Sequence, residues 1–125
     1  MLIDSTIAID FLNGRTTAVQ YLDELTESIK ISRVAVMEIT LGCRTKLELK
    51  KTQKTIIESG WEIVEIDKEI SKTAGVIFEN FYHSHGLGIA DALISATAII
   101  EKETLATHNI KHFKFIKNLN LTIPY

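Results

Sequence analysis

The sequence has few of the residues that build small cross-linked or repetitive proteins. Among 125 residues it has one cysteine, Cys43, one proline, Pro124, and six glycines. A lone cysteine cannot form an internal disulfide, so a disulfide-scaffolded domain is excluded. No internal repeat or low-complexity segment occurs, which also excludes collagen-like and solenoid architectures.

An excess of one charge and a long apolar run are missing as well. The net charge is −2, without the strong basic excess of a dedicated DNA-binding domain. A nuclease remains compatible with this balance, because an acidic site can lie beside local basic patches. The longest strongly apolar segment, 89–100, is too short to span a bilayer and contains Asp91.

The first residues do not look like a signal peptide. They have no basic stretch, and Asp4 and Asp10 interrupt the apolar residues. We therefore expect a cytoplasmic protein without membrane association. The hydrophobic fraction of 46% and charged fraction of 24% are typical of a folded globular protein, and the length fits one domain over residues 1–125.

Short apolar segments alternate with helical patterns along the whole chain. Strands are predicted at residues 1–4, 29–31, 61–66, 105–107 and 119–123, and helices at 6–13, 17–26, 33–44, 46–59, 67–84, 88–103 and 110–115. Strands separated by helices imply crossover connections and a buried parallel sheet. The predicted fold is α/β, with a parallel sheet of four to five strands flanked by helices.

Three acids and one amide stand at the edge of, or inside, apolar runs: Asp4, Glu38, Asp91 and Asn109. Ligands of a parallel sheet bind outside the carboxyl ends of its strands, where Asp4 and Asn109 are expected. Neither Glu38 nor Asp91 has a lysine or arginine three or four positions away. Embedded carboxylates that the fold brings together repel one another, and a divalent cation resolves that repulsion.

Each acid also has a simpler interpretation. Asp4 can cap the helix that follows it, Asp91 can favour a helix N-terminus, and Glu38 can face solvent at a helix edge. Because the fold is expected to bring all three acids near one edge of the sheet, a single metal site explains them better than three separate roles. Oxygen ligands select Mg²⁺ or Mn²⁺, and the chemistry that needs such a site is phosphodiester hydrolysis.

The four segments that carry these residues resemble the PIN-domain ribonucleases, in particular the VapC toxins of type II toxin–antitoxin pairs. The segments are MLIDST, SRVAVMEITLG, DALISATA and LATHNIKHF, and they occur in the family's order over essentially the whole chain. By this resemblance Asp4, Glu38 and Asp91 are metal-coordinating acids. Asn109 matches a fourth position where Asp and Asn both occur, so the number of bound ions, one or two, stays open.

The resemblance also assigns supporting residues. Thr6 and Thr107 match hydroxyls that support the site by hydrogen-bonding the acids or a bound water. The family commonly has Asp where this chain has His112, before Phe113. We assign His112 no metal role.

The resemblance implies a Mg²⁺- or Mn²⁺-dependent endoribonuclease that acts as the toxin of a VapBC-like pair. It further implies cleavage that leaves a 5′-phosphate and a 3′-hydroxyl, a homodimer, and a small VapB-like antitoxin that blocks the acidic groove. Two alternatives remain open: a catalytically weak PIN-fold binding module, which Asn109 favours, and an aspartyl phosphatase with Asp4 as nucleophile. The phosphatase usually needs a second acid where Thr6 stands.

Two basic groups could contact an RNA backbone. Solvated helix faces explain the same pattern, especially where Glu48 and Glu58 are interspersed. The predicted RNA-binding residues are Arg44, Lys46, Lys50, Lys51 and Lys54 in the first group and Lys111 and Lys114 in the second.

Overall fold

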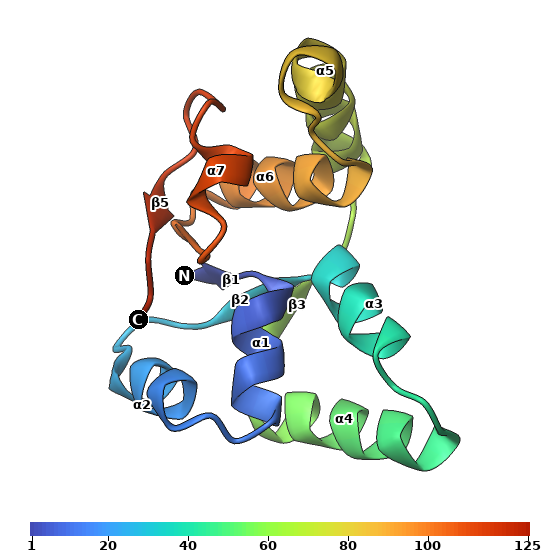
Figure 1. Ribbon diagram of the computed structural model, residues 1–125, viewed down its shortest axis with the longest axis vertical. Coiled ribbons are helices and arrows are strands. Elements are labelled where there is room, and N and C mark those ends of the chain that lie inside the picture. The colour runs from blue at the N-terminus through green and yellow to red at the C-terminus, as the bar shows by residue number, and fades with distance from the viewer.

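A computed structural model describes residues 1–125, and it contains the predicted parallel sheet. Five strands pair in the order β3-β2-β1-β4-β5, and every pair is parallel. Parallel neighbours require crossover connections, which the helices supply (Figure 1). The strands are β1 (Leu2–Ile3), β2 (Lys30–Ser32), β3 (Glu62–Val64), β4 (Leu105–Ala106) and β5 (Leu121–Thr122).

All seven predicted helices are present. Four of them begin where a side chain caps the first turn: Asp4, Ser32, Thr45 and Asp67 each accept a hydrogen bond from a backbone N–H two or three residues on. The helices are α1 (Ser5–Leu12), α2 (Thr16–Glu24), α3 (Arg33–Leu41), α4 (Lys46–Glu58), α5 (Lys68–His85), α6 (Ile89–Glu101) and α7 (Ile110–Phe113).

Several boundaries differ from the sequence-based ones. The helix predicted to reach residue 44 ends at Leu41, with Gly42 as its C-cap. The strands predicted at 61–66 and 119–123 shrink to three and two residues. Each is limited by its neighbour, because β3 pairs only with Lys30–Ser32 and β5 only with Leu105–Ala106. An apolar segment is a strand only where a partner strand runs beside it.

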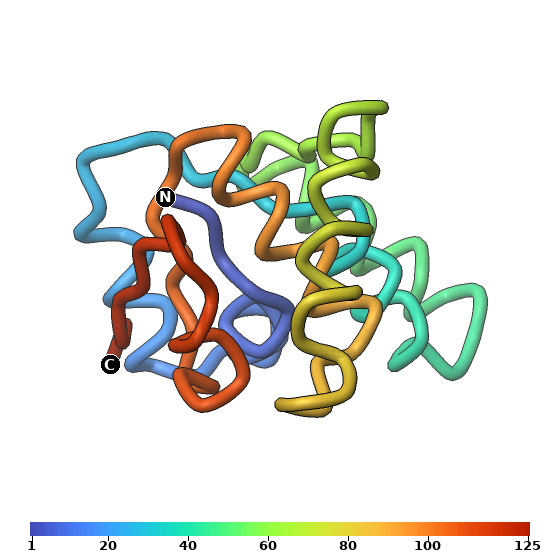
Figure 2. The backbone as a smooth tube through the Cα atoms, turned by 90° about the horizontal axis from the view of Figure 1, so that it is seen from above, coloured from blue at the N-terminus to red at the C-terminus, as the bar shows by residue number.

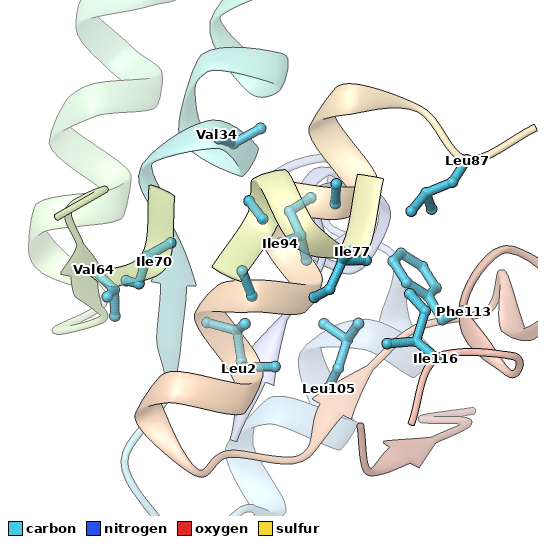
Figure 3. Packing of buried hydrophobic residues seen from close by; sticks show 14 residues of the cluster. Leu2, Val34, Val64, Ile70, Ile77, Leu87, Ile94, Leu105, Phe113 and Ile116 are labelled. Carbon is cyan, nitrogen blue, oxygen red and sulfur yellow. The ribbon is translucent and has the colours of Figure 1, made fainter. Parts of the chain in front are cut away.

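The sheet has a hydrophobic core on each face, since successive strand residues point to opposite sides. Leu2 and Leu105 belong to the core beneath α5 and α6, which Figure 3 shows together with Ile77 and Ile94. Ile3, on the opposite face, belongs to the second core, which also holds residues of α1, α2, α3 and α4. None of the helices combines the length and apolar character that crossing a bilayer requires.

The strand order determines where a ligand can bind. The chain first builds β1, β2 and β3 in one direction and then returns to add β4 and β5 on the other side of β1. In Figure 2 the first strand (blue) leads straight into α1, beside the orange and red C-terminal segments. In open α/β sheets the crevice at such a reversal, outside the carboxyl ends of the strands, is the usual binding site.

Candidate metal centre

The four residues singled out from the sequence line a single cavity of about 380 Å³ at the β1–β4 reversal. Asp4 follows β1, Glu38 lies inside α3, Asp91 lies in the first turn of α6, and Asn109 follows β4. Segments separated by up to about a hundred residues therefore meet at one place. No lysine or arginine lines this cavity.

Asp4 is held firmly in position. Its side chain accepts hydrogen bonds at Oδ1 from the Thr6 hydroxyl (2.7 Å) and from the Ile7 backbone N–H (3.1 Å), and at Oδ2 from the Thr107 hydroxyl. The residue is 5% exposed. The capping interpretation of Asp4 is thus correct, and the same carboxylate also faces the cavity. The two threonines expected to support the site both contact Asp4.

Glu38 is the least satisfied group of the cavity. Its Oε1 atom is buried and has no hydrogen-bond partner. Burial raises the pKa of the Glu38 carboxyl, the neighbouring Ser5 hydroxyl opposes this rise, and the charges of Asp91 and Asp4 add to it. An unpartnered carboxylate oxygen in such a place costs free energy unless a cation or an ordered water reaches it.

Asp91 lies on the other side of the cavity, at the start of α6, and its side chain is 29% exposed. Its Oδ2 lies 3.4 Å from Nδ1 of His112 on α7. Burial raises the pKa of the Asp91 carboxyl; the nearby His112 lowers it, and the charge of Asp4 raises it further. The only ion-pair partner of Asp91 within the chain is therefore an imidazole, which is charged only when protonated.

Asn109 is exposed and begins α7. Its backbone N–H donates to the Thr107 hydroxyl (3.0 Å), and that hydroxyl in turn donates to Asp4. The backbone of Asn109 is thus tied to the buried Asp4 carboxylate through the Thr107 side chain. The side-chain amide of Asn109 is neutral. Because it adds an oxygen and no charge, three carboxylates remain to attract a cation.

The donor set fits a hard, hydrated cation. No three His, Cys, Asp or Glu side chains converge closely enough to surround one ion by themselves. Mg²⁺ usually keeps several waters and takes only one or two carboxylates directly, so a wider cavity with oxygen donors suits it. The partnerless oxygen of Glu38 supplies an independent sign that a cation or water belongs there.

Beyond the four predicted residues and Thr6, six residues line the cavity, and Ser5 and His112 are the two of them with polar side chains. Ser5 directly follows Asp4, and His112 lies three positions after Asn109, on the same side of a helical turn. Their closeness in sequence to Asp4 and Asn109 could have drawn attention to Ser5 and His112. Their place in the cavity, however, depends on which elements pack beside them. His112 contacts Asp91 through Nδ1.

The predicted RNA-contacting cations lie outside the cavity. The first group is on and just before α4, and Lys54 pairs with Glu58 (3.8 Å). Lys111 and Lys114 are exposed on and just after α7, and they form no ion pair within the chain. In Figure 1, α4 and α7 are separated by α1. The two groups therefore lie at separate places on the molecule.

Several known proteins are similar to this chain in sequence and in fold. The chain is 34% identical over 122 residues to Ribonuclease VapC19 of Mycobacterium tuberculosis, covering 94% of this chain and 95% of that protein. It is 33% identical over 126 residues to Ribonuclease VapC1 of Methanocaldococcus jannaschii, covering 98% and 85%. The crystal structure of VapBC2 from Rickettsia felis, bound to a DNA fragment from their promoter, superposes with a TM-score of 0.80 at 27% identity over 97% of this chain and 96% of that one. The family model described as PIN domain matches residues 1–117, and the chain accordingly belongs to the PIN-domain family.

Proposed function

We propose that this protein is a divalent-metal-dependent endoribonuclease, acting as the toxin of a VapBC-like type II toxin–antitoxin pair. The observation that carries the proposal is the buried, unpartnered oxygen of Glu38 in a cavity shared with Asp4 and Asp91. Since the cavity contains no lysine or arginine, the charge of the three acids is left for a bound cation to neutralise. The names of the VapC relatives add ribonuclease activity to this electrostatic argument.

Each residue has a definite role in this proposal. Asp4, Glu38 and Asp91 would hold Mg²⁺ or Mn²⁺. When bound, the ion supplies the positive charge that makes a water nucleophilic near neutral pH and that neutralises the phosphate and the leaving oxygen. Thr6 and Thr107 keep Asp4 in a single orientation through their hydroxyl hydrogen bonds.

Asn109 is placed to contact water or phosphate by its amide. As a neutral group it contributes less than a carboxylate to the binding of a second cation, so we expect one tightly held ion. Its link through Thr107 to Asp4 fixes it relative to the acids. The α7 residues that follow, Lys111 and Lys114, would approach the RNA backbone.

The aspartyl phosphatase alternative finds little support in the geometry. Both carboxylate oxygens of Asp4 already accept hydrogen bonds, and the side chain is almost fully buried. A nucleophile needs a free oxygen that the phosphorus atom can reach in line. Asp4 is instead held in the manner of an oriented ligand.

The partner we propose is a VapB-like antitoxin. The similar structures include VapBC2 of Rickettsia felis and a toxin–antitoxin complex from Klebsiella pneumoniae. The face formed by α1, α3 and α4 contains a groove of about 350 Å³. On the same helices, Met37 and Leu41, one turn apart on α3, and Leu47 on α4 are 58%, 86% and 66% exposed. Exposed apolar side chains beside a groove are typical of protein interfaces when they form a continuous patch.

The groove and the acidic cavity share two helices: α1 contributes Thr6 to the cavity and Ile9 to the groove, and α3 contributes Glu38 to the cavity and Ile39 to the groove. A segment seated in the groove could therefore extend a basic side chain into the cavity and neutralise its acids. We also propose a homodimer and a cytoplasmic site of action, where RNA is available as substrate.

Cleavage of a structured RNA with and without EDTA tests the enzymatic proposal. We expect activity with Mg²⁺ or Mn²⁺, no activity in EDTA, and loss of activity in Asp91→Asn. The matched control is Glu79→Gln, an acid-to-amide change on the exposed side of α5. Activity that is indifferent to the chelator, or a fully active Asp91→Asn protein, would contradict the assignment.

Calorimetric titration with Mn²⁺ separates this proposal from the catalytically weak binding module. An enzyme of the proposed type binds the ion through its three acids, and Asp91→Asn should weaken that binding. A PIN fold that serves only as a scaffold should release no heat specific to the site.

A further inference from the structure

Beside the acidic cavity lies a cluster of aromatic side chains that the proposed function does not use. It consists of Tyr21 on α2, His108 between β4 and α7, and Tyr125 after β5; we name these three residues the aromatic shelf. The Tyr125 ring packs edge-to-face against His108, with ring centroids 4.5 Å apart, and against Tyr21 at 6.0 Å. The shelf therefore joins three segments at one surface.

The shelf is held in place by an ion pair beneath it. The Tyr125 hydroxyl donates to Oδ2 of Asp10 (2.7 Å), and the same oxygen accepts from Nη1 of Arg15 (3.0 Å). The Arg15 guanidinium also lies 5.6 Å from the centre of the Tyr125 ring, at cation–π distance. This arrangement orders the tyrosine before any ligand arrives, which lowers the entropic cost of binding.

His108 connects the shelf to the catalytic centre. It stands between Thr107, which donates to Asp4, and Asn109, which lines the acidic cavity. Consecutive Cα atoms are about 3.8 Å apart, so the backbone of His108 directly adjoins Asn109 at the rim of the acidic cavity. The His108 side chain is exposed, whereas Tyr21 and Tyr125 are partly buried.

Both tyrosines line an open hollow of about 330 Å³. Thr17, Gln20 and Glu24 from α2 and Pro124 complete its wall. Aromatic faces combined with amide, hydroxyl and carboxylate groups are the means by which proteins recognise splayed single-stranded bases. A carboxylate also repels the phosphate backbone, so this hollow suits a base edge and not a phosphate.

We propose that the aromatic shelf is a nucleobase-binding subsite for the nucleotide next to the scissile phosphate. The base stacks on the His108 ring and against the tyrosines, while Glu24 accepts a hydrogen bond from an amino group of the base. This makes cytosine preferred over uracil at that position, because only cytosine carries an exocyclic amino donor. The inference rests on the proposed ribonuclease function and adds a substrate preference to it.

Binding of a short, fluorescein-labelled single-stranded RNA to the cleavage-deficient Asp91→Asn protein in EDTA tests the subsite without catalysis. In this background we expect His108→Ala and Tyr21→Leu each to raise Kd by about tenfold, the scale of one lost base stack. His108→Phe should restore binding, since it keeps an aromatic face. Tyr82→Leu is the matched control, a tyrosine 52% exposed on α5 that should leave Kd unchanged.

A second measurement excludes a merely structural effect. In the same Asp91→Asn background, Glu24→Gln should lower the preference for oligocytidine over oligouridine while the circular dichroism spectrum stays the same. Unchanged Kd in both His108→Ala and Tyr21→Leu, or equal binding of the two homopolymers by the parent protein, would overturn the proposal. Absence of metal-dependent cleavage with this binding intact would instead contradict only the ribonuclease assignment.

Discussion

The two ends of the parallel sheet both gather acidic side chains, but the chain neutralises only one of them. At the amino ends of the strands, Lys30 Nζ lies 3.2, 3.5 and 3.7 Å from carboxylate oxygens of Glu103, Glu101 and Glu62. The Met1 ammonium adds a contact of 2.6 Å to Glu103. At the carboxyl ends, the three acids of the candidate metal centre face a cavity without lysine or arginine.

The pKa shifts at the two ends run in opposite directions. A hydrogen bond from the Met1 ammonium, together with Lys30, lowers the pKa of the Glu103 carboxyl. Burial raises the pKa values of Glu38 and Asp91. Acids that serve the fold are thus paired with cations inside the chain, whereas acids that serve the proposed chemistry have no lysine or arginine partner.

The largest expected effect comes from a substitution in the candidate metal centre, at the carboxyl ends of the strands. Asp4→Asn should lower metal-dependent RNA cleavage by at least about a hundredfold, because it removes a ligand that three hydrogen bonds hold in place. Cleavage assays and Mn²⁺ calorimetry measure the loss. Asp23→Asn, on the exposed face of α2, is the control and should keep full activity; an Asp4→Asn enzyme within a few-fold of the parent would contradict the role given to Asp4.

The next prediction concerns the ion pairs at the amino ends of the strands. Lys30→Met should lower the free energy of unfolding by about 2 kcal/mol, because it leaves the partly buried Glu101 without a cation and Glu103 with the Met1 ammonium alone. Urea denaturation measures the change. Lys54→Met removes an exposed pair with Glu58 (77% and 64% exposed) and should cost less than about 0.5 kcal/mol. Equal losses in the two variants would show that burial does not distinguish these ion pairs.

A third variant should have the opposite sign from Lys30→Met. Glu38→Gln removes a partly buried charge with an unpartnered oxygen, so it should raise the metal-free free energy of unfolding by about 1 kcal/mol while abolishing cleavage. Urea denaturation in EDTA gives the stability, and an RNA assay gives the activity. A destabilised Glu38→Gln protein would mean that the Glu38 side chain supports the fold.

The smallest expected effect concerns pH. The raised pKa of Glu38 means that the folded protein takes up a proton at a pH where the unfolded chain has already lost it, so this carboxyl destabilises the metal-free fold most at neutral pH. The stability gap between Glu38→Gln and the parent should therefore narrow as the pH falls from about 7 toward about 5, by less than about 1 kcal/mol. Thermal unfolding in EDTA measures it.

Glu103 provides the contrast in the same experiment. With its pKa lowered, its stabilising contribution is complete above the unfolded-state value of about 4.3 and is lost as the pH falls through the folded-state value. A Glu103→Gln variant should therefore differ from the parent by a constant amount between about pH 7 and about pH 5. If the stability difference from the parent changed with pH in the same way for Glu38→Gln and Glu103→Gln, the acids at the two ends of the sheet would not differ as proposed.

Much of the fold followed from local patterns. The number and order of strands and helices were predicted correctly, because apolar periodicity and capping residues such as Ser32 and Asp67 act over a few positions. Strand lengths were not, because a strand extends only as far as its partner. The four polar residues of the cavity were identified from their apolar surroundings and their resemblance to a family, and the structure brings all four together.

Contacts between distant segments could not be predicted from the sequence. His112 faces Asp91 only because α7 packs beside the start of α6. The contact of His108 with Tyr125 joins segments that follow the neighbouring strands β4 and β5, and Asp10, far from both in sequence, accepts hydrogen bonds from Tyr125 and Arg15. Periodicity within one segment cannot report which other segment lies across from it.

By itself the sequence determined which elements form and which acids lack a neighbouring cation, because both properties depend on residues a few positions apart. Only the tertiary structure decided that β1 and β4 lie side by side. That adjacency places Thr107 on Asp4 and brings Asp91 and Asn109 to the same cavity. The charge of the site is a property of the sequence, and its concentration in one place is a property of the strand order.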